Sequence, residues 1–285
     1  MTAMERPSID LSGKVAVVTG GGAGIGRGVA TVLARCGADV VALDIDPSLA
    51  ERTARLVEEH GVRGAAVACD VMDIDQIRSA MSLVDRDFGR IDILVNNAGG
   101  VSRKAFIDQS ERSWRRHVDI NLISVFAATS AAVPVMIRQG EGGSIVNVTS
   151  IEATRAAPMY AVYAACKAAV ASFTRSMALE LAEYGIRVNA IAPDATDTPG
   201  NRGLAGSVPD ELPPLGQEDK SRIAGYVPIG REGDVDECGE LVAFLCSSMA
   251  SYITGVSVPV DGGTWAAGGW VRNAQGNWTL FGDRA

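Results

Sequence analysis

The stretch Lys14-Val-Ala-Val-Val-Thr-Gly-Gly-Gly-Ala-Gly-Ile-Gly26 decides the fold of this 285-residue chain. Its apolar first half predicts a buried strand, and the residues that follow carry apolar side chains at helical spacing. In the turn between them, Gly20 can take a positive φ, and Gly24 and Gly26 have no Cβ to block a close approach. The first N–H groups of the helix can then bind phosphate oxygens. The stretch therefore predicts a dinucleotide-binding strand–turn–helix unit.

The rest of the chain repeats this alternation of short apolar runs and helical patterns. Strands are predicted at residues 14–19, 39–44, 64–70, 91–95, 144–149, 187–191 and 256–260, and helices at 25–36, 48–59, 74–88, 111–137, 160–184 and 235–247. The alternation indicates an α/β fold with a parallel sheet covered by helices on both faces. We expect residues 1–285 to form a single domain, with a core of about 11–263 and a C-terminal extension of 264–285. Residues 193–228, rich in Pro, Gly and Asp, are expected to be irregular.

A second motif, Ser150 followed by Tyr163-Ala-Ala-Cys-Lys167, suits proton transfer to or from a carbinol oxygen. A free phenol has a pKa of about 10 and is a weak base at neutral pH. A lysine one helical turn away, together with a nicotinamide cation, is expected to lower the pKa of Tyr163. Tyr163 could then accept the alcohol proton as hydride leaves the carbon. Ser150 would hold the substrate oxygen, and Lys167 would also hold the nicotinamide ribose.

Asp44, at the end of the second predicted strand, bears on the choice of cofactor. A carboxylate there accepts hydrogen bonds from the ribose hydroxyls of adenosine and repels a 2′-phosphate. Neither Ile45 nor Ala23, which occupies a turn position suited to a phosphate-binding side chain, supplies a positive charge. The sequence therefore predicts NAD rather than NADP.

Together these motifs resemble the short-chain dehydrogenase/reductase family in its compact single-domain form, over about residues 11–263. The resemblance implies a Rossmann-type, doubly wound sheet of seven parallel strands in the order 3-2-1-4-5-6-7. It also implies a catalytic tetrad of Asn121, Ser150, Tyr163 and Lys167, in which Asn121 supports a water linked to Lys167. The motifs and the resemblance together indicate these cofactor-binding residues: Gly20, Gly22, Ala23, Gly24, Ile25, Gly26, Asp44, Ile45, Asp70, Val71, Asn97, Ala98, Gly99, Tyr163, Lys167, Pro193, Thr196 and Thr198.

Asp194 and Glu152 both lie near the expected site. The family usually has Pro-Gly after its sixth strand, whereas this chain has Pro193-Asp194, which alters the turn that approaches the nicotinamide. Thr198 still occupies the position expected to bind the carboxamide. Glu152 lies two residues after Ser150, where family members line the substrate pocket. It is expected either to recognise a substrate hydroxyl or amine, or to be a solvated loop carboxylate.

Composition narrows the functional classes. The formal net charge of −8 argues against a nucleic-acid or anionic-membrane surface. No apolar run is expected to reach the roughly 20 residues that span a bilayer, and residues 1–11 lack the apolar core of a signal peptide. The five scattered cysteines contain no C-x-x-C pair, so we expect no metal site and no disulfide framework. A cytoplasmic protein is expected.

The long predicted helices 111–137 and 160–184 are apolar over more than one face. The resemblance implies that these helices pair between subunits, so we expect their surplus apolar residues to pack in the interfaces of a homotetramer. The residues concerned are Phe126, Val133, Val170, Phe173 and Met177. The extension carries Trp265, Trp270, Trp278 and Phe281, which are unfavourable in water. We expect the extension to cross onto a neighbouring subunit near its substrate pocket, with folding back onto its own subunit as the alternative.

The predicted reaction is reversible hydride transfer between NAD and a secondary alcohol or ketone, with alcohol oxidation as the favoured direction. A 3-oxoacyl thioester reductase (acyl carrier protein or coenzyme A) suits the same fold and tetrad. A non-catalytic NAD-binding scaffold is an alternative of another class. A Ser–Lys hydrolase is disfavoured because no G-x-S-x-G elbow surrounds Ser150. Steroid, sugar, acyl and small cyclic alcohols all remain open as substrates.

Overall fold

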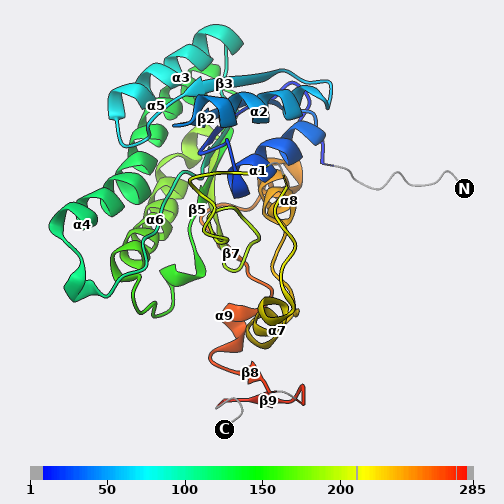
Figure 1. Ribbon diagram of the computed structural model, residues 1–285. Helices are drawn as coiled ribbons and strands as arrows, with labels where there is room; N and C mark the ends of the chain where they lie inside the picture. Colours follow the sequence, from blue (N-terminus) through cyan, green and yellow to red (C-terminus); the bar gives the residue numbers. More distant parts are fainter. Residues whose placement is uncertain (1–8, 210, 274, 281–285) are drawn as a thin grey trace, which may run out of the picture.

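The computed structural model describes residues 9–209, 211–273 and 275–280 (Figure 1). The strands of the main sheet are β1 (Val15–Thr19), β2 (Asp39–Asp44), β3 (Gly64–Ala68), β4 (Ile93–Asn96), β5 (Gly143–Val148), β6 (Ile186–Pro193) and β7 (Ser257–Val260). The helices are α1 (Gly24–Arg35), α2 (Pro47–Glu58), α3 (Ile74–Phe88), α4 (Glu111–Val118), α5 (Ser124–Gln139), α6 (Ala161–Glu180), α7 (Gln217–Tyr226), α8 (Val235–Cys246) and α9 (Thr264–Ala267). The alternation of strands and helices agrees with the sequence pattern.

The sheet is parallel and has the order β3-β2-β1-β4-β5-β6-β7, which confirms the predicted order. β1 pairs with β2 on one side and with β4 on the other. The chain therefore winds away from β1 in both directions. In such sheets, ligands bind outside the carboxyl ends of the strands at this switch point. The glycine-rich turn after β1 and the residues after β4 meet there.

Alternating strand residues build one hydrophobic core on each face of the sheet. Val15 and Val17 of β1 belong to one core, and Ala16 and Val18 belong to the other, because successive residues of a strand point to opposite faces. Residues of α3, α5 and α6 complete the first core, and residues of α1, α2 and α8 complete the second. Figure 1 shows α5 and α6 on one side of the sheet and α1 and α8 on the other. The result is a three-layer sandwich.

The predicted helix 111–137 is continuous but not uniform. α4 passes through a π-helical segment, Asp119–Ile123, into α5. By length and composition alone, the helical stretch Glu111–Gln139 is a candidate membrane span, with a window of hydropathy 1.9 that is 44% buried. A helix in the core of a folded domain passes the same test of length and composition. Packing on the sheet accounts for one apolar face of α5, because Ala128, Ala132 and Met136 are fully buried in the core there.

The segment 193–228 is less irregular than predicted, because it contains α7. The helix carries acidic residues in its first turn, which favour a helix N-terminus. None of its ten residues, all within the described chain, is fully buried. Without an apolar stripe, the sequence offered no helical periodicity to detect.

The C-terminal extension leaves the sheet after β7. It forms the short helix α9 and then a hairpin of β8 (Val271–Arg272) and β9 (Trp278–Thr279). Figure 1 places these elements beside α7, beyond the end of the sheet. α7 and the extension therefore gather near the carboxyl ends of β6 and β7.

Candidate active site

A cavity of about 550 Å³ surrounds the glycine-rich turn, and most of its lining residues follow the carboxyl ends of β1 to β4. Gly20 has a φ of 62°, and a Cβ on it would lie 2.9 Å from the Cα of Ala98. A Cβ on Gly26 would lie 2.0 Å from the Gly20 carbonyl oxygen. The turn and α1 can therefore pack this closely only with glycine at both positions. Gly24 and Ile25, at the start of α1, line the cavity, so free helical N–H groups are available to a pyrophosphate there.

Asp44 lies on the edge of this cavity, at the end of β2. Its Oδ2 accepts a hydrogen bond from the Gly22 N–H at 2.9 Å, and its Oδ1 accepts one from the Asp46 N–H at 3.0 Å. These bonds hold the carboxylate in place. Each carboxylate oxygen can still accept a further hydrogen bond, so the residue fits an adenosine ribose.

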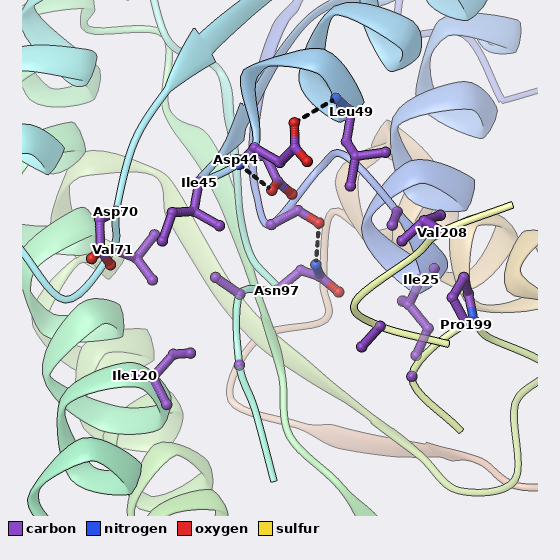
Figure 2. A pocket seen from close by; sticks show the side chains of 18 of the residues that line it. Ile25, Asp44, Ile45, Leu49, Asp70, Val71, Asn97, Ile120, Pro199 and Val208 are labelled. Carbon is purple, nitrogen blue, oxygen red and sulfur yellow. Dashed lines mark hydrogen bonds between the residues drawn. The ribbon is translucent and has the colours of Figure 1, made fainter. Parts of the chain in front are cut away.

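The rest of the cavity suits an adenine ring. Figure 2 shows Asp44, Ile45, Asp70 and Val71 along one side and Ile25, Pro199 and Val208 along the other. Ala23, Asn97, Ala98 and Gly99, four of the predicted cofactor-binding residues, also line it. Asn97 supports the turn directly, because its Nδ2 donates to the carbonyls of Thr19 and Gly20, both at 3.0 Å.

A second cavity, of about 500 Å³, brings together all four residues of the predicted tetrad, Asn121, Ser150, Tyr163 and Lys167. Pro193 also lines it. The residues that line both cavities are Ile25, Asn97, Gly99 and Thr198. The two cavities are therefore neighbours, and a dinucleotide in the first can present its nicotinamide end to the tetrad.

Two elements position the reactive side chains. Ser150 follows β5 and begins a short 3-10 helix, where its Oγ accepts from the Glu152 N–H at 3.2 Å. Tyr163 and Lys167 lie one turn apart on α6, with the lysine Nζ 5.6 Å from the tyrosine ring centroid. Lys167 is buried, and its Nζ donates to the Val148 carbonyl at 2.8 Å. That bond aims the ammonium toward the end of β5 rather than toward solvent.

The electrostatics of the cofactor-free chain differ from the expectation for Tyr163. Burial raises the pKa of Tyr163 to about 12; a hydrogen bond with Ser150 opposes the rise, while the charges of Glu152 and Asp194 add to it. Burial also lowers the pKa of Lys167 to about 8. The expected lowering of the tyrosine pKa therefore does not come from the protein alone, because desolvation outweighs the hydrogen bond with Ser150.

Asn121 sits in the π-helical segment between α4 and α5 and is fully buried. Its Nδ2 donates to the Gly100 carbonyl at 2.8 Å and to the His117 carbonyl at 3.0 Å, and its Oδ1 accepts from the Gly100 N–H at 3.1 Å. A Cβ on Gly99 would lie 2.9 Å from that Oδ1 and 3.4 Å from the Lys167 Nζ. Asn121 thus holds the chain after β4 close to the lysine. The π turn that presents it is a feature often found at functional sites.

Three predicted cofactor residues do not line either cavity. Gly22 and Gly26 lie behind the lining, where one donates to Asp44 and the other lets α1 approach the turn. Thr196 is buried, and its carbonyl accepts from the Asn201 Nδ2 at 2.7 Å. The chain after β6 thus turns Thr196 inward and places Thr198 at both cavities.

Several lining residues were not predicted. The cofactor cavity includes Leu49, Met72 and Ile120, and the second cavity includes Tyr160, Asn201 and Tyr226. Tyr226 comes from α7, about sixty residues after Tyr163 in the chain. No local motif marks these side chains, because tertiary packing alone brings them to the cavities.

Comparison with known proteins is consistent with this geometry. A family profile described as Enoyl-(Acyl carrier protein) reductase matches residues 20–264. Oxidoreductase UcpA of Salmonella typhimurium is 41% identical over 256 residues, which cover 89% of this chain and 95% of UcpA. The chain belongs to the short-chain dehydrogenase/reductase family.

Other members of the short-chain dehydrogenase/reductase family extend the comparison. Galactitol 2-dehydrogenase of Agrobacterium fabrum is 39% identical over 262 residues, covering 90% of this chain and 98% of that enzyme. A putative short-chain alcohol dehydrogenase from Sinorhizobium meliloti superimposes with a TM-score of 0.83 at 36% identity, covering 91% and 99% of the two chains. A 7α-hydroxysteroid dehydrogenase in complex with NADH gives 0.81 at 34% identity, covering 90% and 95%. This family member is therefore an oxidoreductase that acts on CH–OH groups with a nicotinamide cofactor.

Proposed function

We propose that the protein oxidises a secondary alcohol to a ketone with NAD, reversibly, and that Tyr163 is its general acid and base. The observation that carries this proposal is the meeting of Ser150, Tyr163 and Lys167 at one cavity that adjoins the cofactor cavity. Bound nicotinamide supplies a hydride acceptor in oxidation and a hydride donor in reduction. The protein must then hold the carbinol carbon and move the hydroxyl proton.

Each residue of the proposed tetrad has a task in that proton transfer. Ser150 donates a hydrogen bond to the substrate oxygen and fixes its position. Tyr163 removes the hydroxyl proton during oxidation and returns it during reduction. The cationic form of Lys167 stabilises the phenolate and holds the nicotinamide ribose. Asn121 keeps the chain after β4 in place beside Lys167 and supports a water-linked proton path.

NAD is the proposed cofactor in preference to NADP. Asp44 holds a fixed carboxylate at the edge of the cofactor cavity, and Ile45 beside it is 67% exposed and uncharged. A 2′-phosphate would meet that carboxylate without a basic partner. The NADH complex of the related 7α-hydroxysteroid dehydrogenase supports the same choice.

We further propose a cytoplasmic homotetramer. Phe126 and Leu179, on α5 and α6, are 38% and 80% exposed, so an apolar surface is available for subunit contacts. Val133 and Met177 pack partly on the core, whereas Val170 is fully buried within the subunit and drops out of the predicted interface. The free cysteines fit a reducing compartment.

A substrate screen tests the proposal. The purified protein is mixed with NAD or NADP and a panel of secondary alcohols, or with NADH and ketones or 3-oxoacyl thioesters, while nicotinamide absorbance is followed. We expect alcohol oxidation with NAD. Turnover confined to thioesters would make the protein a 3-oxoacyl thioester reductase, and cofactor binding without any turnover would make it a scaffold.

A further inference from the structure

One wall of the cavity that holds Tyr163 is built from charged and phenolic side chains. Glu152, Asp194 and Tyr226 line this wall, and Arg155 joins them from behind. They come from the segment after β5, the end of β6 and the end of α7. Glu152 and Asp194 both line the cavity, and their side chains are only 19% and 15% exposed, so both are largely shielded from bulk solvent.

Asp194, which replaces the family's usual glycine, is held on several sides. Its Oδ2 accepts hydrogen bonds from the Tyr226 hydroxyl at 2.8 Å and from the Thr264 Oγ1 at 2.6 Å. The Arg155 Nη2 lies 3.8 Å from its Oδ1. Tyr226 belongs to α7 and Thr264 to α9, so both elements beyond the sheet fix this one carboxylate. A carboxylate held in place before ligand arrives loses little entropy on binding.

Glu152 is paired in the same network. The Arg155 Nη2 donates to its Oε1 at 3.0 Å and to the Tyr226 hydroxyl at 2.6 Å. Glu152 is therefore not the solvated loop carboxylate that was one expectation. Two carboxylates and one guanidinium leave the wall with a net negative charge. Glu152 and Asp194 line the same cavity as Tyr163, and their charges both act to raise the pKa of Tyr163.

This chemistry discriminates between substrate classes. A steroid or an alkyl chain against this wall would displace water from two carboxylates. It would offer no hydrogen bonds in place of those made by the water, which is costly. A carboxylate or phosphate substrate would be repelled, because Glu152 already occupies Arg155. An ammonium group would find both carboxylates already paired with the Arg155 guanidinium, Glu152 at 3.0 Å and Asp194 at 3.8 Å. A neutral substrate with several hydroxyls avoids all three costs, since each hydroxyl can donate to a carboxylate oxygen.

We propose that the substrate is an uncharged polyhydroxylated alcohol, or the corresponding ketose, whose hydroxyls next to the reacting carbinol donate hydrogen bonds to Glu152 and Asp194. This inference rests on the proposed alcohol oxidation and specifies its substrate class. Glu152 and Asp194 are the specificity-determining residues. Arg155, Tyr226 and Thr264 are positioning residues that hold the two carboxylates.

The test compares a hexitol with an apolar alcohol in the same protein. kcat/KM with NAD is measured for sorbitol, mannitol and galactitol, for cyclohexanol, and for the amino alcohol 1-amino-2-propanol. The variants are Glu152→Gln and Asp194→Asn, which keep the size of each side chain and remove its charge. Glu218→Gln, on the exposed α7, is the matched control. Thermal unfolding of each variant checks that it is folded.

We expect at least one hexitol to be preferred over cyclohexanol and over the amino alcohol. Each pocket variant should lower the hexitol-to-cyclohexanol ratio of kcat/KM by about tenfold or more, the usual effect of losing a hydrogen bond to a charged group. Glu218→Gln should leave this ratio unchanged. Preference for cyclohexanol or the amino alcohol, or an unchanged ratio in both pocket variants, would overturn the inference.

Binding separates a failure of this inference from a failure of the proposed function. If no alcohol is oxidised with either cofactor, calorimetry is used to titrate the three hexitols into the protein saturated with NAD. Hexitol binding that weakens about tenfold in Glu152→Gln and Asp194→Asn would support the polyol site even though the oxidation proposal had failed. Absence of hexitol binding to the unmutated protein would refute the polyol site. Asp194→Gly, which restores the residue typical of the family, covers the case in which Asp194→Asn does not fold.

Discussion

At the scale of single residues, Asp44 should decide the choice between NAD and NADP. Its carboxylate is fixed by the N–H groups of Gly22 and Asp46, so it cannot swing away from a 2′-phosphate without losing both bonds. We expect Asp44→Ala to relax the preference for NAD, mainly by improving the use of NADP. The measurement is kcat/KM for each cofactor in both proteins.

Asp70→Ala is a control for that experiment, because Asp70 also lines the cofactor cavity but follows β3. It should affect the two cofactors in similar proportion, since adenine is common to both. Equal use of NADP by the unmutated enzyme would contradict the assignment of Asp44.

Tyr163 should control turnover more than cofactor binding. Tyr163→Phe keeps the ring on α6 and removes only the ionisable oxygen. Turnover should fall by roughly 10²–10⁴, the usual contribution of a general acid or base. NAD affinity of Tyr163→Phe, measured by calorimetry, should change little. Lys167→Ala, in contrast, should lower both turnover and NAD affinity. Near-normal turnover in Tyr163→Phe would mean that another group moves the proton.

The pH dependence of the two directions should be opposite. Oxidation needs the phenolate, so its kcat/KM should rise with pH until Tyr163 is ionised in the NAD complex. Reduction needs the phenol, so its kcat/KM should fall as pH rises through the pKa in the NADH complex. Burial raises the pKa of Tyr163 to about 12 without cofactor, and only the oxidised nicotinamide adds a positive charge. The reduction limb should therefore lie at higher pH than the oxidation limb, and coincident limbs would count against this account.

At the scale of elements, Asp92 joins β1 to β4 at the end of the sheet opposite the site. It is 5% exposed; its Oδ2 accepts from the Val15 N–H at 2.9 Å, and Arg90 donates to both oxygens at 2.7 Å. Burial acts to raise the pKa of Asp92, but the hydrogen bonds from Arg90 and Val15 and the charge of Lys14 outweigh it and leave the pKa below its ordinary value. Asp92→Asn should lower the free energy of unfolding by about 1.5–3 kcal/mol at neutral pH.

The sign of the pH effect follows from the lowered pKa of Asp92. Its stabilisation is fully present above the unfolded-state pKa of about 3.9 and is lost as pH falls through the lower folded-state pKa. The stability difference between the wild type and Asp92→Asn should therefore shrink in acid. Denaturant unfolding at several pH values measures it, with the exposed Asp108→Asn as control. A difference that stays constant down to the lowest pH would contradict this prediction.

At the scale of the whole molecule, the C-terminal extension contacts its own subunit through Thr264 and Trp265 but leaves its tryptophans half-exposed. The Trp265 Nε1 donates to the Thr154 Oγ1 at 2.9 Å, yet Trp265, Trp270 and Trp278 remain 51%, 47% and 46% exposed. Arg272 lies over the Trp278 ring, 4.4 Å from its centroid. The predicted Phe281 contact lies outside the described residues. Half-exposed tryptophans of this size indicate a surface that a second subunit could cover.

Removal of residues 268–285 should therefore weaken the tetramer while leaving Trp265 and the Asp194 network in place. Light scattering at several protein concentrations measures the assembly, and NAD titration checks that the cofactor site is intact. We expect a tetramer for the full chain and smaller species for the shortened one. An unchanged assembly after truncation would assign the extension to its own subunit.

The strand–turn–helix unit was predictable because it rests on a local pattern, whereas the sheet order and the tetrad were implied by the resemblance to the family. Val15 to Thr19 alternates between two faces wherever it is buried, and the backbone at Gly20 and Gly26 admits no Cβ. The predicted site residues lie close together in the sequence. Ser150 lies just after β5, and Tyr163 and Lys167 lie one turn apart on α6. In such cases the physical constraint acts within a few residues, so the sequence by itself determined the outcome.

Other features were decided only by the tertiary structure. The pKa of Tyr163 depends on burial, and α7 has no buried stripe that its sequence could announce. The replacement of glycine by Asp194 was visible in the sequence, but its partners Tyr226 and Thr264 lie 32 and 70 residues away. Desolvation and long-range hydrogen bonds depend on which segments meet in space. The glycine-rich turn and Asp44 could therefore be identified from short stretches of sequence, whereas the wall of Glu152, Asp194 and Tyr226 forms only through the packing of distant segments.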